Sequence, residues 1–237
     1  MERLKTELCG ITLDNPVIPA SGTFGYGYEF AELYDINFLG TFSFKGTTAE
    51  PRFGNPAPRI AETPSGMLNA VGLQNPGVEK VVSEELPTLG KCFSKKVIAN
   101  VGGFSVDEYV RVSENLDAEE SVGWLEINVS CPNVHSGGTN FGSDPKAAAE
   151  VVAAVKKAVK KPVIPKLSPN VTDIVAVAKA CEDAGADGLC LINTLLGMRL
   201  DLRTGRPVLA NVTGGLSGSA VFPVAVRAVY QVSGACN

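Results

Sequence analysis

Six short apolar runs recur along this chain, and each of them ends in polar, glycine-rich residues. They are NPVIPASG, FLGTFSFKG, KKVIANVGG, GWLEINVSC, VIPKLSP and DGLCLINT. Continuous apolar runs of this length are typical of strands in a parallel sheet that is covered on both faces. Because parallel strands need long crossover connections, the pattern restricts the chain to an α/β fold in which helices alternate with strands.

Helical patterns lie between the later runs. SDPKAAAEVVAAVKKAVKK can be capped by Ser143 or Asp144, has Pro145 in its first turn and ends in four lysines, where the helix dipole favours cations. DIVAVAKACEDAG also has helical spacing and stops at Gly185. The order of strand, helix and strand therefore predicts βα units.

Two segments fall outside this alternation. LKTELCGITLDNP is interpreted as a small antiparallel hairpin that would plug the floor of a barrel. Residues 50–76 form a long excursion rich in proline and glycine, and loops of that length inside a compact domain are usually functional. No linker is evident, so we expect residues 1–237 to form a single domain.

The composition excludes several classes of protein. The 237 residues, 45% of them hydrophobic, suffice for one large core. The net charge of -4 and the lack of a basic stripe argue against nucleic acid as a partner. The N-terminus is charged where a signal peptide needs an apolar run, and no stretch approaches the ~20 apolar residues of a membrane span. We therefore expect a cytoplasmic protein with a small-molecule ligand, whose six cysteines, without a CxxC pair, are reduced thiols.

The strand ends predict where that ligand binds. In parallel α/β folds the site lies at the carboxyl ends of the strands. The residues at those ends are polar or charged: Ser21, Lys45, Asn100, Asn128, Lys166 and Asn193. A lysine at the tip of an apolar strand is costly unless it meets an anion, so two of them indicate an anionic ligand, although each could instead reach solvent. Further amides expected at the same mouth, where they suit a ring with alternating C=O and N–H groups, are Asn69, Asn75 and Asn133.

Cys131 lies in the stretch NVSCPNVHSGGTNFG, between an apolar run and a loop rich in glycine. A lone cysteine is more often a small buried hydrophobe, but this position at a strand end favours a general base. The glycines of the loop would let it open and close as a lid, or form an ordinary turn. His135, the only histidine, is interpreted as a loop residue and not as a metal ligand.

Glycine-rich loops can bind phosphate, and the sequence has two glycine-rich stretches. GTFGYG at residues 22–27 matches no nucleotide fingerprint and is interpreted as a loop. GGLSG at residues 214–218 precedes a helix-like run from Ser219, so it could present backbone N–H groups to a phosphate.

Four longer motifs occur in order: PRFGNPAPRIAETPSGMLNAVGLQNPG, INVSCPN, PKLSPN and NVTGGLSG. With them the chain closely resembles dihydroorotate dehydrogenases, specifically the class 1B, NAD-linked catalytic subunit. The resemblance runs from the N-terminal hairpin to the last residue. It implies an α/β fold of the (β/α)8 TIM-barrel type with an N-terminal β-hairpin, which binds FMN and oxidises dihydroorotate to orotate in pyrimidine biosynthesis.

The resemblance also implies roles for individual residues. Cys131 would be the base that removes the proton from C5, which is acidic beside a carbonyl, while a hydride leaves C6 for the flavin. The implied substrate contacts are Lys45, Asn69, Ala70, Val71, Gly72, Leu73, Asn128, Asn133, Asn193 and Thr194. The implied FMN contacts are Ser21, Lys45, Gly46, Asn100, Asn128, Lys166, Ile192 and Gly218. Among these, Lys166 would stabilise negative charge on the reduced ring.

Two features depart from the family pattern. His135 stands where many relatives have lysine, a change expected to alter loop closure modestly. The sequence stops at QVSGACN, where the family would continue through two more strands and the turns that hold the FMN phosphate. Since six βα units leave a barrel open, we expect a C-terminally incomplete chain that lacks the last two units.

The resemblance to class 1B implies a partner as well. Such subunits form a homodimer within a heterotetramer and pass electrons to a subunit with FAD and a 2Fe-2S cluster, which reduces NAD. Three alternatives stay open: a dihydropyrimidine dehydrogenase-type domain for uracil or thymine, a fumarate-linked class 1A enzyme, and a non-catalytic truncated scaffold. The loop NAVGLQN favours dihydroorotate over the first of these.

Overall fold

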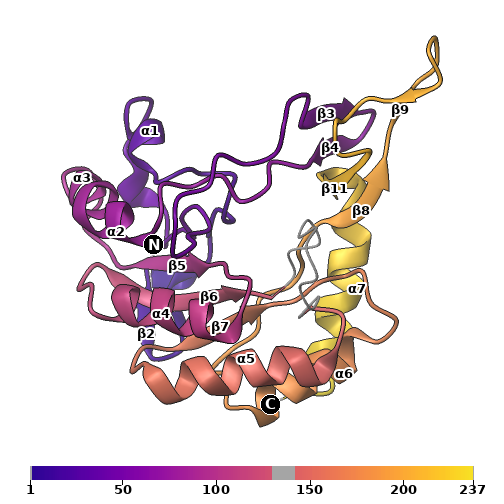
Figure 1. Ribbon diagram of the computed structural model, residues 1–237. Helices are drawn as coiled ribbons and strands as arrows, with labels where there is room; N and C mark the ends of the chain where they lie inside the picture. Colours follow the sequence, from indigo (N-terminus) through magenta and orange to yellow (C-terminus); the bar gives the residue numbers. More distant parts are fainter. Residues whose placement is uncertain (1, 130–141, 237) are drawn as a thin grey trace.

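A parallel sheet lies at the centre of the computed structural model, which describes residues 2–129 and 142–236 (Figure 1). Its regular strands, in spatial order, are β5 (Val97–Val101), β6 (Val122–Asn128) and β7 (Val163–Lys166). They come from the runs KKVIANVGG, GWLEINVSC and VIPKLSP, so the predicted α/β class with a parallel sheet is confirmed.

The neighbouring runs extend this sheet without forming regular strands. FLGTFSFKG and the residue that follows it make parallel bridges to β5 through Ser43 and Thr47, and DGLCLINT makes one to β7 through Cys190. NPVIPASG lies beside FLGTFSFKG, because the N–H of Ser43 donates to the carbonyl of Pro19. The six apolar runs thus lie side by side in sequence order, but only three of them pair regularly enough to be strands.

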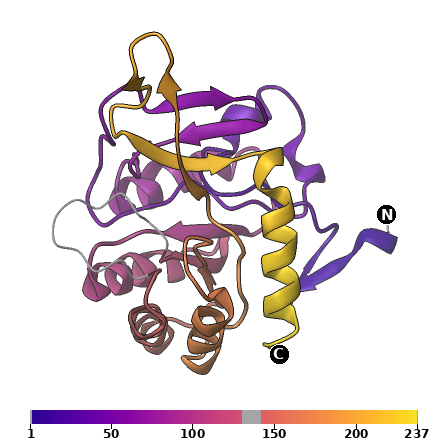
Figure 2. The ribbon, with the colours of Figure 1, turned by 90° about the vertical axis from the view of Figure 1, so that its right-hand side faces the viewer.

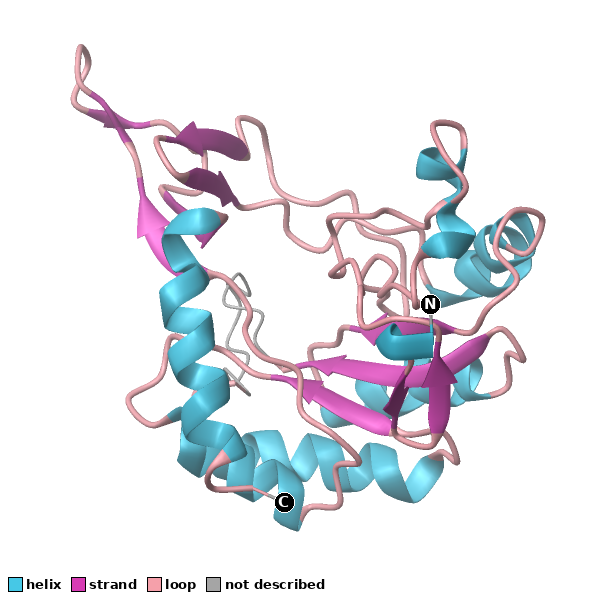
Figure 3. Cartoon of the chain, turned by 180° about the vertical axis from the view of Figure 1, so that it is seen from behind, coloured by secondary structure: helices cyan, strands magenta, loops and turns pink. Residues whose placement is uncertain are grey.

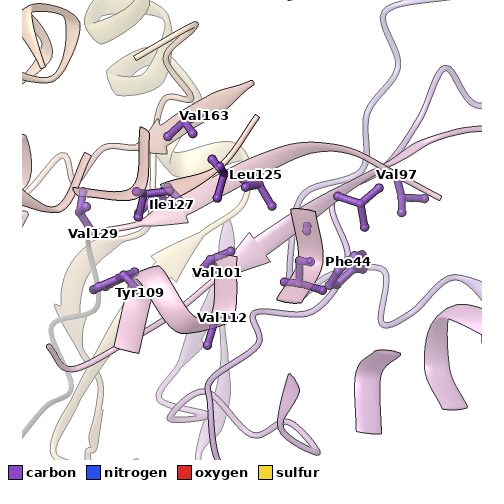
Figure 4. Packing of buried hydrophobic residues seen from close by; sticks show 14 of the residues in the cluster. Phe44, Val97, Val101, Tyr109, Val112, Leu125, Ile127, Val129 and Val163 are labelled. Atoms are coloured by element: carbon purple, nitrogen blue, oxygen red, sulfur yellow. The ribbon is translucent and has the colours of Figure 1, made fainter. Parts of the chain in front are cut away.

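Three helices cover the outer face of the sheet: α4 (Val106–Asp117), α5 (Pro145–Ala158) and α6 (Ile174–Asp183). The carboxylate of Asp144 accepts from the N–H of Lys146 and caps α5, whereas Asp173 caps α6 in the same way. Both helices predicted from the sequence are therefore confirmed. Alternate strand residues pack against this layer with no exposed surface; Figure 4 labels Val97, Val101, Leu125, Ile127 and Val163 among them. Burying each such side chain contributes about 1.5–3 kcal/mol to stability.

The N-terminal hairpin covers the amino ends of the strands. Strands β1 (Thr6–Leu8) and β2 (Ile11–Leu13) pair antiparallel, as predicted. The indole N–H of Trp124, near the start of β6, donates to the carbonyl of Leu8 over 2.9 Å. An apolar cluster under the hairpin includes Leu13, Ile98, Trp124 and Ile164. The hairpin therefore covers this end of the sheet, and the carboxyl ends lie on the opposite side.

A second, antiparallel sheet lies on the side of the carboxyl ends. Its order is β3 (Ile60–Thr63), β4 (Gly66–Asn69), β11 (Thr213–Ser217) and β8 (Leu195–Met198). Beyond it, β9 (Leu200–Asp201) and β10 (Arg206–Pro207) form a projecting ribbon, seen at the top of Figure 2. The excursion at residues 50–76 is therefore not a bare loop, because it supplies β3 and β4.

The expectation for GGLSG changes with this sheet. Instead of a loop that cradles phosphate, its first four residues belong to strand β11, where Gly215 pairs with Asn69 and with Leu196. The partners lie far away in the sequence, and for that reason local glycine content misassigned the segment. GTFGYG does form turns, as predicted, before the short helix α1 (Tyr28–Ala31).

Shorter elements complete the chain. They are η1 (Glu2–Leu4), η2 (Ile36–Phe38), α2 (Val78–Lys80), the π-helical turn η3 (Val81–Glu85), α3 (Leu86–Leu89), η4 (Ser219–Val221) and α7 (Phe222–Ser233). Helix α7 leads away from the antiparallel sheet and packs beside α6 (Figure 3). In the two described ranges, no helix combines the length and the apolar character that crossing a membrane requires.

Candidate active site

A cavity of about 490 Å³ opens where the parallel strands end and the antiparallel sheet begins. Its volume lies within the range of sites that hold small ligands or cofactors, about 300–1,000 Å³. The residues that line it are Ala20, Ser21, Gly22, Thr23, Lys45, Gly46, Ile60, Met67, Asn69, Val71, Gly72, Leu73, Asn100, Asn128, Lys166, Ile192, Asn193, Thr194, Gly215 and Ser217. All six apolar runs and the excursion at residues 50–76 thus meet at one place.

Most of the residues predicted for the site lie in this lining. The exceptions among the described residues are Ala70, Asn75 and Gly218. The side chain of Ala70 is fully buried in an apolar cluster with Ala61 and Leu68, and Gly218 packs against Gly66 behind β11. Three predicted residues, Cys131, Asn133 and His135, lie outside the described residues.

Two lysines enter the cavity from different apolar runs. Lys166 ends β7, is 8% exposed and pairs across the sheet with Asn128 of β6. Lys45 is half-buried, and its ammonium lies close to Gly22, since a Cβ on that glycine would come within 3.7 Å of Nζ. Cations held at the walls of one cavity favour an anionic ligand or a ring that gains negative charge.

The amides form a connected group around these lysines. The amide N–H of Asn193 donates to Oδ1 of Asn128 over 3.2 Å, and its own Oδ1 accepts from the backbone N–H of Thr194 over 2.8 Å. On the opposite wall, the amide of Asn69 reaches the carbonyl of Gly215 at 3.5 Å. Amides fixed in this way offer donors and acceptors in defined directions, which suits a heterocycle with C=O and N–H groups.

Asn75 does not join this group, so its expected place at the mouth was wrong. Its side chain is buried, accepts from the N–H groups of Thr48 and Gly77, and donates to the carbonyl of Leu73. It therefore fixes the loop that carries Val71 to Leu73 to the cavity wall. An asparagine in a turn satisfies neighbouring backbone groups more readily than it reaches a ligand.

The sequence alone did not reveal the wall made by the antiparallel sheet. Ile60, Met67, Gly215 and Ser217 contribute to it, from the hairpin of β3 and β4 and from β11, which is far from that hairpin in the sequence. Gly215 is needed there, because a Cβ at this position would lie 2.0 Å from Oγ1 of Thr194. The turn residues Pro64, Ser65 and Gly66, between the short runs IAET and MLN, were the signal that could have revealed the hairpin.

Beneath the cavity, the carboxylate of Glu126 and the thiol of Cys190 lie on the inner face of the sheet. Glu126 is 5% exposed and accepts hydrogen bonds from Oγ of Ser43, over 2.9 Å, and from the amide of Asn100. Burial, together with the nearby Glu126 carboxylate, raises the pKa of the Cys190 thiol far above its ordinary value. Cys190 is therefore a protonated thiol at neutral pH and is unsuited to be the base of the site.

Comparisons with known proteins agree with the geometry. The family model for dihydroorotate dehydrogenase matches residues 3–237. The chain is 59% identical over 237 residues to a protein of Geobacillus kaustophilus (strain HTA426) named dihydroorotate dehydrogenase B (NAD(+)), catalytic subunit, and 58% identical to its counterpart of the same name in Bacillus caldolyticus. In both comparisons, all of this chain aligns with 75% of the relative.

Proposed function

The chain belongs to the dihydroorotate dehydrogenase family, and from that premise we propose that it oxidises dihydroorotate to orotate in pyrimidine biosynthesis. The observation that carries the proposal is the cavity in which Lys45 and Lys166 meet a connected group of amides. Dihydroorotate carries a carboxylate and an imide edge, which need a cation and paired donors and acceptors. The cavity supplies both.

FMN is the cofactor that this site would hold. The fit rests on the lining: a cavity of about 490 Å³ is bordered by Gly46, which offers only backbone, and by the side chains of Lys166, Asn100 and Asn193. Lys166 and Asn100 offer donors and an acceptor to the polar edge of such a ring. When bound, FMN supplies the acceptor for the hydride that leaves C6 of the substrate.

The residues of the chain then have three tasks. We assign the substrate carboxylate and imide to Lys45, Asn69, Asn128 and Asn193, with backbone groups of residues 71–73 and Thr194 completing the contacts. Lys166, with Ser21, Gly46, Asn100 and Ile192, is assigned to the flavin, where its ammonium would stabilise negative charge. The side chain of Ala70 and the position of Gly218 give them no direct part in the lining.

The third task, removal of the C5 proton, is assigned to Cys131. Its support comes from the family motif INVSCPN, in which it follows Asn128 by three positions. A base within hydrogen-bond reach of the proton typically contributes 10²–10⁴-fold to the rate. Asn133, in the same motif, is proposed as a further substrate contact.

We also propose the complete fold and the partner of the chain. The parallel strands, the helices outside them and the hairpin at their amino ends support a (β/α)8 TIM barrel in which residues 1–237 contribute to one FMN-binding domain. The relatives are named as catalytic subunits of an NAD(+) enzyme. This supports a homodimeric core that passes electrons to a second subunit with FAD and a 2Fe-2S cluster.

An anaerobic titration tests the function. Purified protein with FMN is mixed with dihydroorotate, and the visible flavin band is followed; we expect bleaching at stoichiometric substrate and none with dihydrouracil. Cys131→Ala should retain flavin but bleach at least 10²-fold more slowly at neutral pH, because binding and proton removal use different residues. Bleaching by dihydrouracil alone would favour the uracil and thymine alternative, and bleaching of the variant at the wild-type rate would remove Cys131 as the base.

A further inference from the structure

Glu126 is a buried carboxylate for which the proposed reaction has no use. It lies in β6 two residues before Asn128, so both side chains face the inside of the sheet. Its partners across the sheet are Asn100 of β5 and Ile164 of β7. The next residue below it on this face is Trp124, in the apolar cluster under the hairpin. Glu126 thus occupies the polar level between that apolar floor and the cavity.

Two donors bond to the Glu126 carboxylate, and a thiol lies beside it. The donors are the hydroxyl of Ser43 and the amide N–H of Asn100, and the thiol is that of Cys190. Each comes from a different segment of the parallel sheet. A carboxylate at 5% exposure is costly unless its oxygens are satisfied, and neighbours that can all donate suit a side chain that only accepts. The site therefore favours an acceptor with a negative charge.

The first consequence concerns Asn100, which lines the cavity. Because its amide nitrogen donates to Glu126, its amide oxygen faces the other way, toward Gly46. That oxygen lies 2.6 Å from the position where a Cβ of Gly46 would be. Glu126 therefore decides which end of the amide, donor or acceptor, lies beside Gly46 in the cavity lining.

The second consequence concerns charge. The pKa of the Cys190 thiol responds to two charges, because the Glu126 carboxylate raises it and the Lys166 ammonium lowers it. The carboxylate and the ammonium of the cavity wall therefore belong to one buried layer. In such a layer a charge acts on a bound group with less screening than in water.

We propose that Glu126 is a positioning residue of the FMN site: it turns the acceptor end of the Asn100 amide toward the flavin, and its charge lowers the flavin reduction potential. The inference rests on the proposed function, since it needs FMN in the cavity. It assigns two separable effects to one side chain, namely orientation of an amide and placement of a charge. Substitutions that remove one effect or both can therefore test it.

Three variants of the holoprotein separate the effects. Glu126→Gln removes the charge and replaces one acceptor oxygen by an N–H donor. Glu126→Asp keeps the charge but withdraws it from Asn100. Ser43→Ala is the matched control, because it deletes one donor to the same carboxylate and leaves the charge and Asn100 in place. The readouts are the dissociation constant of oxidised FMN, from flavin fluorescence, and the midpoint potential, from anaerobic titration against a reference dye.

Glu126→Gln should increase the affinity for reduced FMN relative to that for oxidised FMN by about tenfold. This change corresponds to an upward shift of the midpoint potential by about 30 mV for the two-electron couple. Both Glu126 variants should weaken binding of oxidised FMN by about tenfold, and only the Gln variant should move the potential. Ser43→Ala should change neither readout by more than about threefold. An unchanged potential in Glu126→Gln overturns the charge assignment, and wild-type FMN affinity in Glu126→Asp overturns the orientation.

Different results would contradict the proposed function and the role of Glu126. Wild-type protein that binds no flavin, or whose flavin does not bleach with dihydroorotate, contradicts the proposed function itself. Bleaching wild-type protein with unaltered Glu126 variants contradicts only this inference. If Glu126→Gln does not fold, the comparison of Glu126→Asp with Ser43→Ala still decides, because equal FMN affinities in those two would refute the positioning role.

Discussion

Gly46→Ala is expected to disturb the floor of the cavity more than its single methyl group suggests. The new Cβ would lie 2.6 Å from Oδ1 of Asn100 and 3.4 Å from Cδ2 of Leu73. The amide oxygen must move by about 0.8 Å to reach ordinary contact distance. It cannot move freely, because the nitrogen of the same amide donates to buried Glu126. Loss of a hydrogen bond to a charged group costs about 1.5–3 kcal/mol.

We therefore expect Gly46→Ala to lower the free energy of unfolding by about 2 kcal/mol, and Tm by roughly 4–8 °C for a chain of this size. Flavin content per protein should fall as well, since Asn100 and Gly46 line the same cavity. Gly90→Ala, at the end of α3, is the control: its nearest neighbours would lie at 3.5 and 3.6 Å, an ordinary contact. The reasoning is refuted if urea unfolding and flavin content of Gly46→Ala match those of the control.

Three further outcomes follow from the described contacts. Trp124→Phe should lose about 1–3 kcal/mol of stability in urea unfolding, because the carbonyl of Leu8 loses its indole donor; an unchanged midpoint would contradict this anchor of the hairpin. Burial raises the pKa of the Cys181 thiol from 9.0 to about 12, so stability should fall as pH rises through that interval, and Cys181→Ala should show a shallower decline between pH 9.0 and about 12. Lys45→Met should raise the dihydroorotate KM at least tenfold through loss of a charge-assisted contact, whereas Lys157→Met, exposed on α5, should leave KM unchanged.

The sequence predicts the strands and their ends better than it predicts what faces them. An apolar run that ends in a polar residue carries local information, and for this reason Lys166, Asn100 and Asn128 were placed correctly at the cavity. The regularity of strand pairing depends on residues outside each run. FLGTFSFKG lies along β5, but only Ser43 and the following Thr47 form bridges to it. Such irregular edges depend on neighbours that no single run specifies.

Segments that pair over long sequence distances were predicted least well. Strand β11 is glycine-rich and reads locally as a turn, yet β4 and β8 both pair with it. The same holds for Asn75, whose type suits either a ligand contact or a turn, and whose backbone neighbours decide for the turn. The residue type therefore determines what chemistry a side chain can offer. The tertiary contacts determine which of several residues of the same type lie at the site.

Glu126 shows why one strand residue can matter to both stability and chemistry. The inner face of β6 carries Trp124, Glu126 and Asn128 in order from the hairpin to the cavity. The lowest of these is apolar and closes the floor, and the highest meets the ligand space. The middle position must satisfy donors from neighbouring segments without water, because at 5% exposure little solvent reaches it. A neutral side chain of similar size would leave a donor unsatisfied there, so the charge beneath the cavity follows from the hydrogen bonding of the sheet itself, and any redox effect on a flavin above it is a consequence of that requirement.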